Sequence, residues 1–141
     1  EIANKRDPSD GLLYFDFDCG GWQTEGWEST DISSNLAGSL GYLDFKLDSK
    51  KGTIHKTGLQ IRETNHQKSI AIKMKSNASL KIFVANDYGD LGTAEYSGNS
   101  SFEEVLISIN NSTSLSGTTK LKISFRGKKN DLVEIDYIKQ L

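Results

Sequence analysis

Short segments in which apolar and polar residues alternate recur along this chain, and they constrain its fold more than any other feature. The clearest are Ser39–Leu47, Lys68–Lys75, Lys120–Arg126 and Leu132–Leu141. Alternation with a period of two puts successive side chains on opposite faces of an extended strand. Turn residues separate the segments, which return about every 10 to 15 residues. No window of helical length shows apolar residues at three- and four-residue spacing, so the sequence predicts an all-β protein.

Weaker segments complete this pattern. Leu12–Asp18 is predicted as the first strand, Thr53–Ile61 as short strand pieces, and Phe102–Ile109 as a later strand. Leu80–Ala85 follows Lys68–Lys75 after a short turn, so these two segments are expected to form a hairpin. Strands with one apolar and one polar face suit an antiparallel β-sandwich, or jelly roll. We predict two sheets with about 8 to 10 strands in total.

Length and composition narrow the functional classes. The chain has 141 residues, which suits one domain, and its net charge is −2 with both signs scattered throughout. We predict a polar tail or linker at Glu1–Gly11 and one sandwich domain at Leu12–Leu141. No basic patch indicates nucleic-acid binding, and no apolar run approaches the roughly 20 residues that span a bilayer. Cys19 is the only cysteine, which excludes an intrachain disulfide.

The acidic residues of the first and last strand segments suggest a metal site. In Leu132–Leu141, Val133, Ile135 and Tyr137 share one face of an extended strand, and Asp136 lies on the other. If the first and last strands meet, Asp136 comes near Asp16 or Asp18. Calcium prefers carboxylate and carbonyl oxygens, so a calcium site is one interpretation. The alternative is that these carboxylates face solvent or pair with Lys or Arg.

Catalysis is not predicted. Neither His55 nor His66 lies near a serine or cysteine motif, and the chain has no nucleophile elbow. Glu103 and Glu104 are adjacent in a strand and therefore point to opposite faces. The remaining acidic pair, Asp87 and Asp90, lies in a turn-rich segment, where aspartate is common for backbone reasons.

Sugar binding fits the aromatic residues outside the inward rows. Sugar sites combine flat aromatic faces with a few polar side chains that bind hydroxyl groups. Trp27 is expected in the core, whereas Asn86–Ser101 is expected to be a long polar loop that carries two tyrosines. The alternative is that each ring only covers the end of a sheet. The predicted carbohydrate-binding residues are Trp22, Tyr88, Tyr96, Asn86, Asp87 and Arg62.

Several short motifs occur in a familiar order. FDFD at Phe15–Asp18 is followed by EGW at Glu25–Trp27, and later by TGLQI, the strand Ile70–Lys75 and LKIFVAN. The chain then ends with Arg126 in a strand, a polar turn and VEIDYI. From about Leu12 onward, this order resembles the galactose-binding-like β-jelly-roll carbohydrate-binding modules attached to bacterial polysaccharide-degrading enzymes.

The resemblance implies a five-on-four or similar jelly roll without catalysis. It also implies a structural calcium ion between an acidic residue of the first strand and an aspartate of the last strand, here Asp18 and Asp136. Asp16 competes with Asp18 for this role, and the residues Cys19–Trp22 depart from the usual spacing of the family.

We therefore predict a monomeric, secreted or cell-surface module that binds a polysaccharide or oligosaccharide. It would hold the catalytic domain of its parent chain near the substrate and would bind neither nucleic acid nor membrane. One alternative is a structural or adhesive β-sandwich that contacts a neighbouring domain or a protein partner. Another is a small jelly-roll hydrolase or lyase.

Overall fold

A computed structural model describes residues 14–15, 17, 26–30, 32, 36, 42–59, 69–109 and 118–140. This part of the chain forms ten strands and no helix, and therefore contains no helix that is long and apolar enough to cross a membrane. The strands are β1 (Tyr14–Phe15), β2 (Glu28–Thr30), β3 (Leu43–Lys46), β4 (Lys51–Lys56), β5 (Ser69–Ser76), β6 (Leu80–Asn86), β7 (Gly89–Tyr96), β8 (Asn99–Ser108), β9 (Leu121–Arg126) and β10 (Leu132–Gln140).

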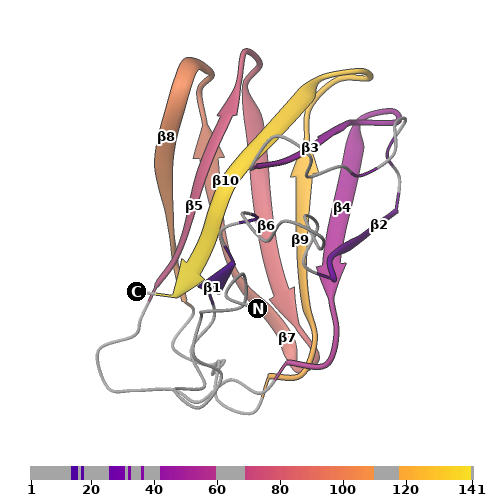
Figure 1. The fold of residues 1–141 in the computed structure, drawn as a ribbon, viewed down its shortest axis with the longest axis vertical. Helices are drawn as coiled ribbons and strands as arrows, with labels where there is room; N and C mark the ends of the chain where they lie inside the picture. Colours follow the sequence, from indigo (N-terminus) through magenta and orange to yellow (C-terminus); the bar gives the residue numbers. More distant parts are fainter. Residues whose placement is uncertain are drawn as a thin grey trace.

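The strands form two five-stranded antiparallel sheets that pack face to face (Figure 1). The first, here called the β10 sheet, has the order β1–β10–β5–β8, and β3 also pairs with β10. The second, the β9 sheet, has the order β2–β4–β9–β6–β7. The predicted all-β antiparallel sandwich is confirmed, with five strands on five in place of the five-on-four arrangement that the resemblance implied.

The core lies between the sheets and comes from the inward rows of both. Phe15 and Trp27 meet edge to face with ring centroids 5.6 Å apart, which confirms the core position of Trp27. Phe45 of the β10 sheet meets Phe125 of the β9 sheet at the same centroid distance. Burying each large apolar side chain contributes about 1.5 to 3 kcal/mol, so these rows account for much of the stability of the sandwich.

The last strand lies inside the β10 sheet and touches three other strands. Its end pairs with β1 through Tyr14 opposite Lys139, which confirms that the first and last strands meet. A β-bulge interrupts the ladder between Ile135 and Tyr137. Beyond the bulge the buried residue is Ile138, and Tyr137 is only partly buried. The prediction that Tyr137 shares a face with Ile135 is therefore wrong, because the extra residue of a bulge shifts the alternation by one.

The predicted hairpin between β5 and β6 is also wrong. β5 pairs with β10 and β8, whereas β6 pairs with β7 and β9 in the other sheet. The short connection after Ser76 therefore carries the chain from one sheet to the other. Both strands bury an apolar row, and crossing over places these rows on opposite sides of one core.

The segment Asn86–Ser101 is not a loop. It contains β7, an edge strand that buries Leu91 and Tyr96 and exposes most of its other side chains, and the start of β8. An edge strand needs few apolar residues, so its sequence looks like a polar connection. At Gly92, β7 comes so close to β8 that a Cβ atom would lie 2.3 Å from the carbonyl oxygen of Ser108. Only glycine fits there without a backbone shift.

Candidate functional site

Tyr96, one of the predicted sugar-binding rings, belongs to the core. Only 3% of its surface is exposed. Its hydroxyl group donates a hydrogen bond to the carbonyl oxygen of Ser76 (3.1 Å) and accepts one from the Ser76 amide (2.9 Å). Tyr96 lies on the β9 sheet and Ser76 on the β10 sheet, so the tyrosine ties the two sheets together. Its expected place on an exposed loop is wrong, because the segment is a strand with an inward face.

Asn86 and Asp87 hold the β6–β7 turn in place. Asn86 Oδ1 accepts hydrogen bonds from the amides of Tyr88 (2.9 Å) and Gly89 (3.1 Å), and Asn86 Nδ2 donates to Thr118 Oγ1 (2.9 Å). Asp87 Oδ2 accepts a hydrogen bond from Thr119 Oγ1 (2.8 Å), and this bond is the main reason that the pKa of Asp87 lies below its ordinary value. Both polar groups thus have structural partners at the end of the hairpin.

Tyr88 lies within this turn and is the most exposed large hydrophobic residue there, with 67% of its surface accessible. The other two residues of the predicted sugar site, Trp22 and Arg62, lie outside the described residues. The structure therefore brings together Asn86, Asp87 and Tyr88 at one end of the sandwich and places Tyr96 in the core.

Some of the predicted calcium ligands also lie outside the described residues. Asp16 and Asp18 lie outside the described residues. Asp136 lies on β10, and its Oδ2 is 3.9 Å from Lys73 Nζ on β5. The described ranges contain no group of three or more His, Cys, Asp or Glu residues arranged to hold a metal ion. Among these residues, a lysine is the cationic partner of Asp136.

Acidic and basic side chains on the outer face of the β10 sheet interact with one another. Lys75 Nζ lies 3.5 Å from Glu134 Oε1, and the Tyr137 hydroxyl group donates to Glu104 Oε2. Glu134 is the cross-strand partner of Asp44. Burial, and then the negative charge of Glu134, raises the pKa of Asp44. The charges of this face are therefore largely satisfied within the face.

Aromatic rings on the same face are also in contact with their neighbours. Tyr42 meets Phe102 with centroids 5.5 Å apart, and Lys75 Nζ lies over the Phe102 ring at 5.0 Å. Lys139 Nζ lies over Tyr137 at 4.7 Å. Such cation–π contacts contribute about 0.5 to 1 kcal/mol at exposed sites and add to the internal cohesion of this face.

The outer face of the β9 sheet, here called the β9 face, differs in character. Its three central strands present basic, hydroxyl and apolar side chains outward, with no carboxylate among them. These residues are Lys51, Thr53 and His55 on β4, Lys122, Ser124 and Arg126 on β9, and Lys81, Phe83 and Ala85 on β6. Among the described residues, the acidic groups of this face lie on the edge strands, where Glu28 of β2 is 3.3 Å from His55 and Glu95 of β7 is the cross-strand partner of Lys81.

Cross-strand register places these residues in rows. Lys51 and Lys81 flank Arg126 in one row, and Thr53 and Phe83 flank Ser124 in the next. The hydroxyl groups of Thr53 and Ser124 are hydrogen-bonded at 3.1 Å. Arg126 lies over the Phe83 ring, with Cζ 4.8 Å from the centroid, and Lys81 Nζ lies 5.6 Å from the same centroid. The ring therefore supports two cationic groups from neighbouring strands.

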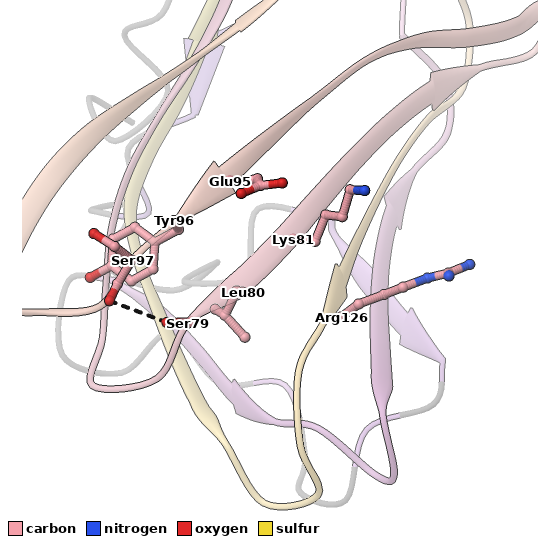
Figure 2. Close-up of a pocket in the computed structure, with 7 residues that line it drawn as sticks. All are labelled: Ser79, Leu80, Lys81, Glu95, Tyr96, Ser97 and Arg126. Carbon is pink, nitrogen blue, oxygen red and sulfur yellow. Dashed lines mark hydrogen bonds between the residues drawn. The ribbon is translucent and has the colours of Figure 1, made fainter.

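A pocket of about 470 Å³ lies on the β9 sheet beside Lys81 and Arg126. Figure 2 shows Glu95, Lys81 and Arg126 projecting from three neighbouring strands, while the ring of Tyr96 points away from them. Ser79 and Ser97 close one end of the pocket through a hydrogen bond from Ser79 Oγ to the carbonyl oxygen of Ser97 (3.4 Å). The pocket thus contains hydrogen-bond donors and acceptors within a small space.

Sequence reasoning missed this face. Leu80–Ala85 and Lys120–Arg126 were predicted as strands, but none of their residues was predicted to contact a ligand. Phe83 is the informative residue, because it is an aromatic ring at a polar-side position of an alternating segment. The rows of the β9 face are formed by pairing between segments that are far apart in the sequence, and the sequence pattern does not reveal this pairing.

No protein-family model and no curated protein matches the chain. Solved structures do match. The module CsCBM6-3 from Clostridium stercorarium, solved in complex with cellobiose, is 15% identical with a TM-score of 0.61, covering 92% of this chain and 93% of that one. The family 29 carbohydrate-binding module CBM29-2 is 13% identical with a TM-score of 0.58, covering 83% of this chain and 82% of that one. The chain has the β-jelly-roll fold of carbohydrate-binding modules.

The same fold also occurs within larger enzymes. A family 43 arabinoxylan arabinofuranohydrolase from Bacillus subtilis, solved in complex with cellotetraose, matches 81% of the module over 23% of its own length, with 15% identity and a TM-score of 0.58. The resemblance of the sequence to jelly-roll carbohydrate-binding modules is thus confirmed at the level of the fold.

Proposed function

We propose that the module is a non-catalytic carbohydrate-binding domain whose ligand lies across the β9 face. The supporting observation is the pocket beside Arg126 and Lys81, on a fold that carbohydrate-binding modules share. This pocket combines charged donors, a carboxylate acceptor and hydroxyl groups.

These groups match the chemistry of a sugar. Each sugar hydroxyl group both donates and accepts hydrogen bonds, so a site needs both kinds of partner. Arg126 and Lys81 only donate, and the carboxylate of Glu95 only accepts. The apolar atoms of Phe83 lie beside them, where C–H groups of a sugar ring can pack. A hydrolytic reaction would need a positioned acid and base, and Glu95 is the one carboxylate among the described residues that line this pocket, although Glu103 and Glu104 line a neighbouring pocket with it.

Affinity electrophoresis tests the proposal. The wild-type chain is run through gels containing xylan, mixed-linkage β-glucan, polygalacturonate or carrageenan, beside the variants Arg126→Ala and Glu95→Gln. We expect the variants to lose most retardation in the gel that retards the wild type, with an unchanged melting temperature. Lys73→Ala on the β10 sheet is the matched control and should be retarded like the wild type. Equal retardation of all four proteins would contradict a site on the β9 face, and no retardation in any gel would favour the structural or adhesive alternative.

Tyr88 is proposed as a second contact at the end of the sandwich, together with Trp22 and Arg62. Its exposed ring supports this role, while Asn86 and Asp87 keep the turn in shape. If a chain end binds there, Tyr88→Ala should weaken binding of short oligosaccharides more than binding of long polymers. Calorimetric titration with both lengths distinguishes this outcome from an equal loss.

The proposed biological role is to hold an attached catalytic domain near a polysaccharide. Tethering raises the effective concentration of the substrate without adding any catalytic contact. This role fits a secreted or cell-surface protein that acts as a monomer. The occurrence of the same fold within a longer arabinofuranohydrolase supports the idea of an attached enzyme.

A structural calcium ion remains a separate proposal. Its ligands would be Asp136 and either Asp16 or Asp18, and the pairing of β1 with β10 supports it because it brings the first and last strands together. The proximity of Lys73 to Asp136 supports the alternative. A bound ion would stabilise the folded state by about 2.7 kcal/mol at a concentration of 100 Kd, so a chelator should lower the melting temperature by several degrees. No shift after chelation would exclude the ion.

A further inference from the structure

We infer that the β9 face recognises an acidic sugar unit, through a carboxylate or sulfate group placed over Arg126 between Lys51 and Lys81. This inference rests on the proposed carbohydrate-binding function and specifies its ligand class. Its basis is the distribution of charge on the face, the support of Arg126 by Phe83 and the hydroxyl groups in the adjacent row.

Positive charge is concentrated on the three central strands of the β9 sheet. Lys51 and Lys81 are both direct cross-strand partners of Arg126, and neighbouring strands lie about 4.8 Å apart. Lys122 adds a fourth positive charge at the same side of β9. Like charges directly opposite one another destabilise a sheet. Placing Lys81 directly opposite Arg126 therefore carries a cost in stability, which a bound anion would offset.

Nearby acidic side chains do not neutralise three of the cations on this face. Lys81, Lys122 and Arg126 make no ion pair within the part of the chain that the structure describes. Glu95 lies on the edge strand β7 opposite Lys81, so Lys81 stands between it and Arg126 in the pocket that all three line. The centre of the face thus attracts an anionic group, and Glu95 is left to accept hydrogen bonds from hydroxyl groups.

Arg126 is held in a position suited to such a group. Its guanidinium carbon lies 4.8 Å from the centre of the Phe83 ring, so the ring supports the planar group. A guanidinium group forms two parallel hydrogen bonds with a carboxylate or sulfate, which a lysine cannot do. Fixing the guanidinium group before binding lowers the entropy lost on binding.

The row beside Arg126 indicates a sugar in preference to other anions. Ser124, which is partly buried, places a hydroxyl group next to the cations, and the hydroxyl group of Thr53, which is only 5% exposed, is its hydrogen-bond partner. Hydroxyl groups of this kind donate to and accept from sugar hydroxyl groups. Nucleic acid would need a wider basic surface, whereas this chain has a net charge of −2.

Matched pairs of polymers test the inference. Binding of the wild-type module is measured by calorimetry against polygalacturonate and its methyl ester, and against a sulfated galactan and its desulfated form. We expect binding about tenfold tighter to at least one acidic polymer than to its neutral partner, because a charge-assisted hydrogen bond is much stronger than a neutral one. The two pairs distinguish a carboxylate ligand from a sulfate ligand.

Single-residue variants identify the side chain that causes the preference for the acidic polymer. Arg126→Ala should remove the preference for the acidic polymer, and Arg126→Lys, which keeps the charge but not the fork, should retain only part of it. Lys73→Ala on the opposite sheet should keep the full preference. Melting temperatures confirm that each variant is folded.

Each outcome decides the question. Equal binding to acidic and neutral polymers overturns the inference but leaves the proposed function intact. An absence of binding to all four polymers overturns the inference, and it overturns the proposed function as well only if xylan and mixed-linkage β-glucan also fail to retard the protein. Equally tight binding of duplex DNA would show a non-specific charge effect and would also overturn the inference.

Discussion

The two outer faces of this sandwich carry similar numbers of charged residues but arrange them in opposite ways. On the β10 sheet, Lys75 meets Glu134 and Lys73 meets Asp136, so basic and acidic side chains satisfy one another. On the β9 sheet, Arg126 lies between two lysines with no acid on its own strand or on either neighbouring strand of that face. The difference indicates that charge on one face serves the stability of the protein and that charge on the other is available to a ligand.

Introducing an acid into the β9 face should have the largest effect. In Ser124→Glu the new carboxylate would lie between Lys122 and Arg126 and would resemble the paired arrangement of the other face. We expect affinity for an acidic polysaccharide to fall by about a hundredfold or more, because like-charge contacts across an interface cost several kcal/mol. Calorimetric titration measures this change. Ser124→Gln, which adds similar bulk without charge, is the matched control, and an equal loss in both variants would show that size alone matters.

Removing a cation from the β10 sheet should have a smaller effect, which lowers the stability of the protein and leaves its affinity for polysaccharide unchanged. Lys75→Met leaves Glu134, whose side chain is only 13% exposed, beside Asp44 without its cationic partner. We expect a loss of about 1 kcal/mol in the free energy of unfolding, since the carboxylate is partly shielded from water. Urea denaturation at pH 7 measures it, and gel retardation by polysaccharides should not change. A binding defect without a stability defect would reverse the roles assigned to the two faces.

Replacing either of two aspartates should give the smallest effects, which are changes of opposite sign in the melting temperature. The pKa of Asp44 is raised by burial and then by Glu134, so its charged form is disfavoured in the folded state and its contribution to stability falls as the pH rises above 3.8. The pKa of Asp87 is lowered by the Thr119 hydroxyl group, so its contribution is present above pH 3.8 and is lost as the pH falls through the folded-state value. At pH 7, Asp44→Asn should therefore raise the melting temperature and Asp87→Asn should lower it. Thermal melts from pH 7 to pH 2 should show both differences shrinking on acidification, and shifts of the same sign would contradict the assignment.

Much of the fold was predictable because the alternation of apolar and polar residues indicates which side chains of a strand are buried. The strands β5, β6 and β9 and the inward row in the first half of β10 were predicted correctly, as was the meeting of the first and last strands. Pairing was not predictable for β5 and β6, because a buried row does not reveal which strand lies beside it. Edge strand β7 was missed since it buries only Leu91 and Tyr96 strongly, and the bulge in β10 was missed since it leaves no mark on composition.

The candidate site was less predictable than the fold. Polar residues of a turn and polar residues of a ligand site have the same composition, so the sequence pattern does not separate the predicted role of Asn86 and Asp87 as sugar ligands from the role that they have in holding the hairpin. The row of Lys51, Arg126 and Lys81 comes from three segments that meet only through tertiary pairing. The decisive property of this face is that its three central strands carry no outward-facing acidic residue, and that appears only when neighbouring strands are known.

The close approach of β7 and β8 at Gly92 affects how copies of the protein can associate at high local concentration. Exposed edge strands are common sites of strand-to-strand association between copies of a protein. Here the edges of the two sheets face one another, so that the Ser108 carbonyl group occupies the space where a side chain on β7 would stand. Protein concentrated on a polysaccharide surface would meet its own copies often. We expect the close approach at Gly92 to limit edge pairing there, so that dense coverage does not lead to aggregation.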